Sequence, residues 1–293
     1  MKKQFFTTIQ NIFENDNRTI LLLGDIGVFG FSNVLQKYPD RAYNIGILEQ
    51  STVGLAAGLA MTGFIPIVHT IAPFLVERSY EQLKLDFGYQ KLGGNFISVG
   101  SSYDYAALGC THHCPADVGI LKNIPGMEIV VPGTAEEFDS LFKQAYSNDH
   151  PTYYRLSERQ NDNSYPVSFG KATIIKKGSK ATVIAVGPAL KSTLDACEHE
   201  DVTILYYTTV HPFDRKTLHS NIRGNKIIMC EPYYSGAAAL DISIAAAGKK
   251  IQTAFIGIPL EFLRHYGTLN NQDKFLQLTA NDIRRKIKRL IKA

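Results

Sequence analysis

The residue best suited to chemistry in this sequence is Glu49. It directly follows the apolar run Ile45–Leu48, which is too short for a helix and fits the end of a buried strand. A helix of small residues follows, in which Gly54 and Gly58 leave one face almost without side chains. A carboxylate in such apolar surroundings is costly to ionise. Two interpretations are open: Glu49 offsets the dipole at a helix N-terminus, or it exchanges a proton with a buried heterocycle.

A second carboxylate and two aromatic rings accompany other predicted elements. Asp25 follows the apolar strand Thr19–Leu23, at the sheet edge where α/β proteins bind ligands, although an Asp after a strand is also a common helix cap. Phe74 and Tyr80 lie on a predicted helix over residues 73–92. An aromatic ring that stacks on a heterocycle adds about 0.5–1.5 kcal/mol beyond burial, but an apolar helix stripe is by default part of the core.

The polar loop after residue 100 carries Thr111-His112, and an imidazole can donate or accept a proton near neutral pH. The run Cys110, His112, His113 and Cys114 also permits a metal site. Its spacing does not match paired zinc knuckles and no second Cys/His pair follows, so we expect no metal ligands in this chain.

The elements that must position these residues alternate between strands and helices. Strands are predicted at 19–23, 43–48, 65–69, 95–100 and 151–156, then at 181–186, 202–207, 226–231 and 251–256. Helices are predicted at 4–15, 73–92, 134–147, 189–199 and 235–247. This pattern predicts two successive α/β domains with mainly parallel sheets. We expect the first at residues 1–160, a linker and entry at 161–180, and the second at 181–293.

Composition limits the classes of function. The net charge is +4 over 293 residues, and basic residues gather only at Arg284–Lys292, where Ile283 and Ile287 predict an amphipathic helix with a solvated basic face. No apolar run approaches the ~20 residues of a membrane span. Four cysteines without a framework indicate a reducing compartment. We therefore expect a cytoplasmic protein that binds neither nucleic acid nor a membrane.

Several stretches together resemble the transketolase family of thiamine-diphosphate enzymes. The run GILEQSTVGLAAGLA is similar to the family's pyrimidine-binding motif, Phe-x3-Arg-x-aromatic-Glu-Gln to the helix that lines the pyrimidine pocket, and Thr111-His112 to its Thr-His pair. The second half resembles the family's C-terminal domain, through Val210–Asp214 and Glu231–Ala239.

The resemblance implies a role for each candidate residue. Glu49 and His112 would be catalytic, with Glu49 on the pyrimidine nitrogen and His112 at substrate oxygens. The residues implied to bind the cofactor, thiamine diphosphate, are Asp25, Glu49, Phe74 and Tyr80. The residues implied to bind substrate are His112, His113, Arg155 and Lys3.

One family module is missing from the sequence. Transketolases hold the diphosphate through Mg2+ with a Gly-Asp-Gly motif, whereas Gly24-Asp25 is followed here by Ile26. The resemblance therefore implies the second subunit of a split transketolase. A separate diphosphate-binding subunit would carry the Mg2+ ligands, in a heterotetramer with two copies of each.

The family's substrate-phosphate ligands are also replaced. An ungapped alignment places Lys3, Phe29, Glu158 and Gly100 at those positions, and Leu108 where the family has an Asp that binds a sugar hydroxyl. A Glu repels a phosphate dianion, although a shift of one residue would place Arg159 there. We expect a sugar substrate without a terminal phosphate, such as a nucleotide-linked sugar. Two alternatives remain: the beta subunit of a 2-oxo-acid dehydrogenase, and a non-catalytic structural subunit.

Overall fold

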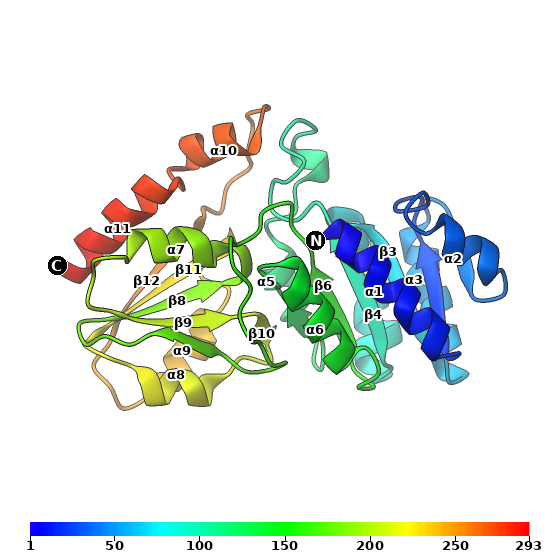
Figure 1. The fold of residues 1–293 in the computed structure, drawn as a ribbon, viewed down its shortest axis with the longest axis horizontal. Helices are drawn as coiled ribbons and strands as arrows, with labels where there is room; N and C mark the ends of the chain where they lie inside the picture. Colours follow the sequence, from blue (N-terminus) through cyan, green and yellow to red (C-terminus); the bar gives the residue numbers. More distant parts are fainter. Residues whose placement is uncertain (293) are drawn as a thin grey trace.

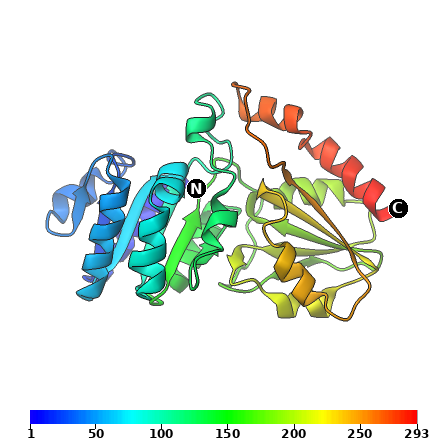
Figure 2. The same cartoon turned by 180° about the vertical axis from the view of Figure 1, so that it is seen from behind.

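The computed structural model describes residues 1–292, which form two β-sheets with helices on both faces of each (Figures 1 and 2). The first sheet has the strand order β10-β5-β6-β4-β3-β1-β2. Its strands are β1 (Thr19–Leu23), β2 (Ala42–Asn44), β3 (Ile65–Ile71), β4 (Gly94–Val99), β5 (Glu128–Val130), β6 (Pro151–Arg155) and β10 (Thr209–His211). All neighbours in this sheet are parallel except β10 and β5.

Successive residues of these strands face opposite sides, so that each face of the sheet is covered by its own helices. Leu21 and Leu23 pack with α1 (Lys2–Asn15), α2 (Ser32–Lys37) and α6 (Ala135–Ala145). Ile20 and Leu22 pack with the helices of the other face. Those are α3 (Glu49–Met61), α4 (Tyr80–Gln82), the wide π-helical turns η1 (Phe74–Arg78) and η2 (Leu83–Tyr89), and α5 (Asp117–Leu121).

The second sheet has the order β12-β11-β8-β9-β7, and only β7 is antiparallel to its neighbour. Its strands are β7 (Thr173–Lys176), β8 (Thr182–Val186), β9 (Thr203–Tyr207), β11 (Lys226–Tyr234) and β12 (Gln252–Ile258). The helices of this half are α7 (Leu190–Ala196), α8 (Arg215–Asn221), α9 (Ala239–Ala245), α10 (Leu269–Leu276) and α11 (Ala280–Lys292). The short 3-10 turn η4 (Gly187–Ala189) precedes α7, and a second such turn, η3 (Cys110–His112), lies in the first half of the chain. Helices α7 and α11 lie on one face of the sheet, and α8 and α9 on the other (Figure 1).

The two halves share a sheet and a core. Strand β10 follows β9 in the chain but pairs with β5 of the first sheet, and the amide of Val131 donates to the carbonyl of Thr208 (2.7 Å). One continuous apolar cluster includes residues of both sheets. The predicted boundaries at residues 160 and 180 stay a prediction, and strand β10 crosses that division.

The predicted fold class is confirmed, and several elements match closely. Strand β1 has the predicted bounds, and α11 buries Ile283 and Ile287 as its pattern indicates. No helix among residues 1–292 is both long enough and apolar enough to cross a membrane. The sequence did not predict α2, α5, β7, β10, α8 or α10.

One prediction near Glu49 is wrong. The strand expected at 43–48 ends at Asn44, because the chain leaves the sheet at Gly46, which has a φ of +87°. Ile47 and Leu48 are therefore not buried strand residues but are 65% and 57% exposed.

Candidate functional site

Glu49 lies where the carboxyl ends of β1, β2 and β3 meet. It is the first residue of α3, and it is 2% exposed. The hydroxyl of Thr70, near the end of β3, donates a long hydrogen bond to its Oε1 (3.4 Å). Burial of a carboxylate at this edge of a parallel sheet is typical of ligand sites in α/β proteins.

The main partner of Glu49 is Arg78, which the sequence did not single out. Its Nη1 donates to Glu49 Oε2 at 2.6 Å. The guanidinium also lies over the ring of Phe74, with Cζ 4.2 Å from the ring centroid. Phe74 and Arg78 are the first and last residues of the π-helical turn η1. The motif Phe-x3-Arg contains this arginine, but its spacing alone does not reveal the pairing with Glu49.

His112 approaches the same aromatic ring from another segment. The rings of Phe74 and His112 meet edge to face, with centroids 5.4 Å apart. On its other side, His112 lies 6.1 Å from the ring of Tyr105. The hydroxyl of Thr111 is 3.0 Å from His112 Nδ1. The structure thus connects Glu49 through Arg78 to Phe74, and Phe74 to His112.

Asp25 lies at the same sheet edge, after β1. Its backbone amide donates to Asn44 Oδ1 (3.0 Å), and Asn44 Nδ2 donates to Asp25 Oδ1 (3.1 Å). Asp25 has a φ of +57° and is exposed. This paired amide and carboxylate hold the loop between β1 and α2 against the end of β2.

Arg155, which is predicted to bind substrate, is buried in the described chain, and its role stays a prediction. Its side chain is 0% exposed, and its Nε donates to Asp117 Oδ2 at 2.7 Å. Its Nη2 donates to Ser102 Oγ (2.9 Å), while Nη1 has no partner among the described residues. Arg155 is buried because β6 directs its side chain into the interior, where it meets Asp117, the first residue of α5.

Three other predicted ligands make no side-chain hydrogen bond to Glu49 or His112 within the described residues. Lys3 is exposed on α1, and Tyr80 packs against the apolar core. His113 is buried, neither ring nitrogen has a partner within the described residues, and burial lowers its pKa. Their roles toward the substrate or cofactor stay predictions.

A cleft beside His112 lies between the two halves of the chain. One wall is the segment Asp104–Leu108, and the other is the segment Gly267–Asn270 at the start of α10, with Glu158 also in the lining. Asp104 accepts hydrogen bonds from Ser157 Oγ (3.2 Å) and from the amide of Glu158 (3.0 Å). Burial raises the pKa of Asp104 to about 6. Glu158 itself is exposed, so a carboxylate faces this cleft.

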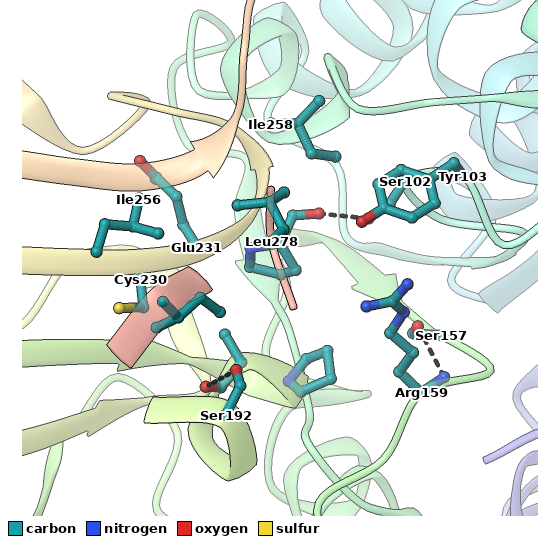
Figure 3. Close-up of a pocket in the computed structure, with 14 residues that line it drawn as sticks. Ser102, Tyr103, Ser157, Arg159, Ser192, Cys230, Glu231, Ile256, Ile258 and Leu278 are labelled. Atoms are coloured by element: carbon teal, nitrogen blue, oxygen red, sulfur yellow. Dashed lines mark hydrogen bonds between the residues drawn. The ribbon is translucent and has the colours of Figure 1, made fainter. Parts of the chain in front are cut away.

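Two hydrogen bonds to Asp273 hold the wall formed by α10 against the first half of the chain. Asp273 Oδ1 accepts from the hydroxyl of Tyr103 (2.6 Å) and from Arg159 Nη2 (2.8 Å). Figure 3 shows Tyr103 and Arg159 on one side of a cavity that lies between the two halves, with Leu278 and Ile258 also in its lining. Arg159 is therefore paired with α10, although its guanidinium lines this cavity.

A second contact ties this segment to the loop that carries His112. Gly109 has a φ of +74°, and a Cβ atom there would lie 2.5 Å from the ring of Tyr266. Figures 1 and 2 both show the segment before α10 beside this loop. We call residues Pro259–Leu276, which connect β12 to the end of α10, the strap.

Metal ligands are not assembled in the described part of the chain. Within residues 1–292, no group of three His, Cys, Asp or Glu side chains is placed to hold a metal ion. The exposed Cys110 and the buried Cys114 are both free thiols, and Cys114 Sγ donates to Glu77 Oε1 at 3.7 Å.

Comparisons with known proteins identify a family and several relatives of this chain. Residues 1–162 match the family model described as transketolase, pyrimidine binding domain. An uncharacterised 33.6 kDa protein in the fasciation locus of Rhodococcoides fascians is 36% identical over 283 residues, which cover 95% of this chain and 91% of that protein. One of the subunits of an apulose-4-phosphate transketolase from Actinobacillus succinogenes is 29% identical over 204 residues, which cover 67% of this chain and 66% of that protein.

A solved structure has the same fold. It is described as a split-gene transketolase in an inactive β4 tetramer, and it matches with a TM-score of 0.86. The match covers 99% of this chain and 97% of that chain, at 20% sequence identity.

Proposed function

The chain belongs to the transketolase family through its pyrimidine-binding domain, and we propose that it is the second subunit of a two-component transketolase. Such an enzyme moves a two-carbon ketol unit from a ketose to an aldehyde acceptor. The observation that carries the proposal is the buried carboxylate of Glu49 at the carboxyl edge of the first sheet, which Arg78 and Phe74 connect to His112.

The family's cofactor is thiamine diphosphate, and the residues around Glu49 suit its pyrimidine end. A pyrimidine offers ring nitrogens and an amino group at its edge and an apolar π-face. Glu49 supplies a buried carboxyl group for the edge, and Phe74 supplies a ring for the face. When bound, thiamine diphosphate supplies the nucleophilic carbon and the electron sink that cleavage of a ketose carbon–carbon bond requires.

This chain's own residues would handle protons and orientation. Glu49, when protonated, donates a hydrogen bond to a pyrimidine nitrogen and so fixes the orientation of the ring. His112 Nδ1 lies beside the Thr111 hydroxyl, which leaves Nε2 to give or take a proton at a substrate oxygen. Phe74 and Tyr105 restrict the imidazole from two sides.

The diphosphate and Mg2+ belong in this proposal to a partner subunit. The chain lacks Gly-Asp-Gly, and large apolar side chains lie exposed beside Glu49, at Ile47, Leu48 and Leu55. Exposed apolar surface next to a site is typical of a protein interface. We propose that a diphosphate-binding transketolase subunit covers these residues, in a heterotetramer with two copies of each subunit.

The substrate in this proposal is a sugar without a terminal phosphate, for example a nucleotide-linked sugar. Glu158 places a negative charge in the cleft beside His112, and Arg159, the nearest alternative for a phosphate, is paired with Asp273. Phe29 is 98% exposed in the loop after β1, where it offers an aromatic face rather than an anion ligand.

The test uses the chain together with the subunit that co-purifies with it from native cells. We expect thiamine diphosphate with Mg2+ to bind the pair tightly and the single chain weakly, as measured by calorimetry. Glu49→Gln should lower ketol transfer by roughly 10²–10⁴-fold, the usual contribution of a general acid–base group, while Glu198→Gln, at an exposed position in the second half of the chain, leaves it unchanged.

Three results would contradict the proposal. Full activity of Glu49→Gln would point to a structural subunit. Decarboxylation of 2-oxo acids by the pair would point to a dehydrogenase component. Good turnover of xylulose 5-phosphate with ribose 5-phosphate would reject the unphosphorylated substrate.

A further inference from the structure

The guanidinium of Arg78 bridges Glu49 and Phe74. It makes two contacts at once: a 2.6 Å hydrogen bond to Glu49 Oε2 and a stack on the Phe74 ring at 4.2 Å. A guanidinium is planar, carries N–H donors along its edge and stacks on aromatic faces. These are the features by which an aminopyrimidine would be recognised at the same two side chains.

We propose that Arg78 closes the pyrimidine pocket of the free chain and must turn out toward solvent before thiamine diphosphate can bind. The inference rests on the proposed function, because that function assigns Glu49 and Phe74 to the pyrimidine. The guanidinium and the pyrimidine cannot both stack on the same face of Phe74 and bind the same oxygen of Glu49. Binding is therefore an exchange of one planar nitrogen group for another.

The two residues of the ion pair differ in how easily they can leave. The side chain of Arg78 is 40% exposed, whereas that of Glu49 is 2% exposed. Arg78 can therefore carry its charge into water at little cost, since its head is already partly hydrated. It ends the π-helical turn η1, and such wide turns occur frequently at functional sites.

Release of Arg78 frees one oxygen of Glu49. Once the guanidinium leaves Oε2, only the long contact from Thr70 to Oε1 remains at Glu49. The carboxyl group can then bind the edge of a pyrimidine ring in place of the guanidinium.

The experiment measures binding of thiamine, which lacks the diphosphate, to the isolated chain. Because thiamine needs neither Mg2+ nor the partner subunit, calorimetry then reports on the pyrimidine pocket alone. We expect Arg78→Ala to bind thiamine about tenfold more tightly than the unmodified chain, equivalent to about 1.4 kcal/mol. Arg78→Lys, which keeps the charge without the planar face, should lie between them. Phe74→Leu should weaken binding in every background.

Two controls keep the result interpretable. Arg289→Ala removes an exposed arginine on α11 and should leave binding unchanged. In the unmodified chain, the NMR chemical shifts of the Arg78 guanidinium should change from those of an ion pair to those of a solvated arginine when thiamine is added. Equal or weaker binding by Arg78→Ala, or an unchanged Arg78 signal at saturation, would overturn the inference. If binding is weaker but Glu49→Gln still abolishes ketol transfer, the proposed function survives and only the exchange fails.

Discussion

The phenol of Tyr103 donates a hydrogen bond to the carboxylate of Asp273, which lies 170 residues further along the chain (2.6 Å). The same Asp273 oxygen accepts from Arg159, whose guanidinium stacks on the Tyr103 ring at 5.1 Å. Tyr103 belongs to the loop that leads to His112, and Asp273 belongs to the strap. This contact is therefore a physical link between the second sheet's half of the chain and the candidate site.

Asp273→Ala should loosen this link. Loss of a hydrogen-bonded charge leaves Arg159 and Tyr103 without their acceptor and should cost about 1–3 kcal/mol of unfolding free energy. We expect faster amide hydrogen exchange in the strap and in the segment Tyr103–His112, measured by mass spectrometry. Asp195→Ala, an exposed carboxylate on α7, is the matched control. Unchanged exchange in the Tyr103–His112 segment would mean that the strap does not restrain that loop.

The ion pair of Asp117 and Arg155 should be structural rather than part of substrate binding. Both side chains are fully buried, and removal of one partner from such a pair costs about 3–5 kcal/mol. Asp117→Leu should therefore lower the free energy of unfolding by that amount, measured by urea denaturation. Adding Arg155→Met should recover most of the loss. Arg285→Ala, which removes an arginine side chain that is 78% exposed, should change stability by less than about 1 kcal/mol.

Glu231 should make the protein less stable as the pH rises. Burial raises the pKa of its carboxyl group to about 8, while in the unfolded chain it is near 4.3. The folded state thus binds the Glu231 proton more tightly than the unfolded state does. The stability that this gives is fully present below the pKa of the unfolded state, and it is lost as the pH rises through the pKa of the folded state. Over the whole interval this amounts to on the order of 5 kcal/mol.

The measurement compares urea denaturation at pH 5 and pH 9 in the unmodified chain and in Glu231→Gln. The variant carries no titrating group at this position, so its stability should fall by several kcal/mol less over that range. All other groups titrate alike in the two proteins. An equal fall in both would show that Glu231 does not titrate in this interval.

Glu158 should decide whether the cleft beside His112 tolerates a phosphate. Glu158→Arg replaces a repulsive charge with one that pairs bidentately with phosphate oxygens. We expect saturation-transfer NMR to show binding of D-ribose but not D-ribose 5-phosphate to the unmodified chain, and the reverse preference in the variant. The exposed Glu198→Arg should leave the preference unchanged. Equal binding of both sugars before substitution would contradict this assignment.

Local patterns predicted the elements around the site better than its contacts. The apolar run of β1 and the small-residue helix of α3 depend on neighbouring residues, which the sequence displays directly. The same patterns failed at Ile47 and Leu48, because an apolar residue at a strand end can face a partner surface as well as a core.

The polar contacts could not be predicted, since they join distant residues. Arg78 lies 29 residues from Glu49, and Arg155 lies 38 residues from Asp117. Each arginine is directed by its own element toward a carboxylate on another one. An exposed basic residue and a buried one look alike in sequence, so the sequence alone reveals neither the burial of Arg155 nor the pairing of Arg78 with Glu49.

Strand β10 has a consequence for any attempt to divide this chain. A protein truncated after residue 162, where the family match ends, would lose β10 and leave β5 with a row of unpaired amides and carbonyls along a buried strand. Open edges of this kind recruit other strands and lead to aggregation. We therefore expect the pyrimidine-binding half alone to aggregate more readily than the whole chain, because β10 of the second half covers the edge of β5.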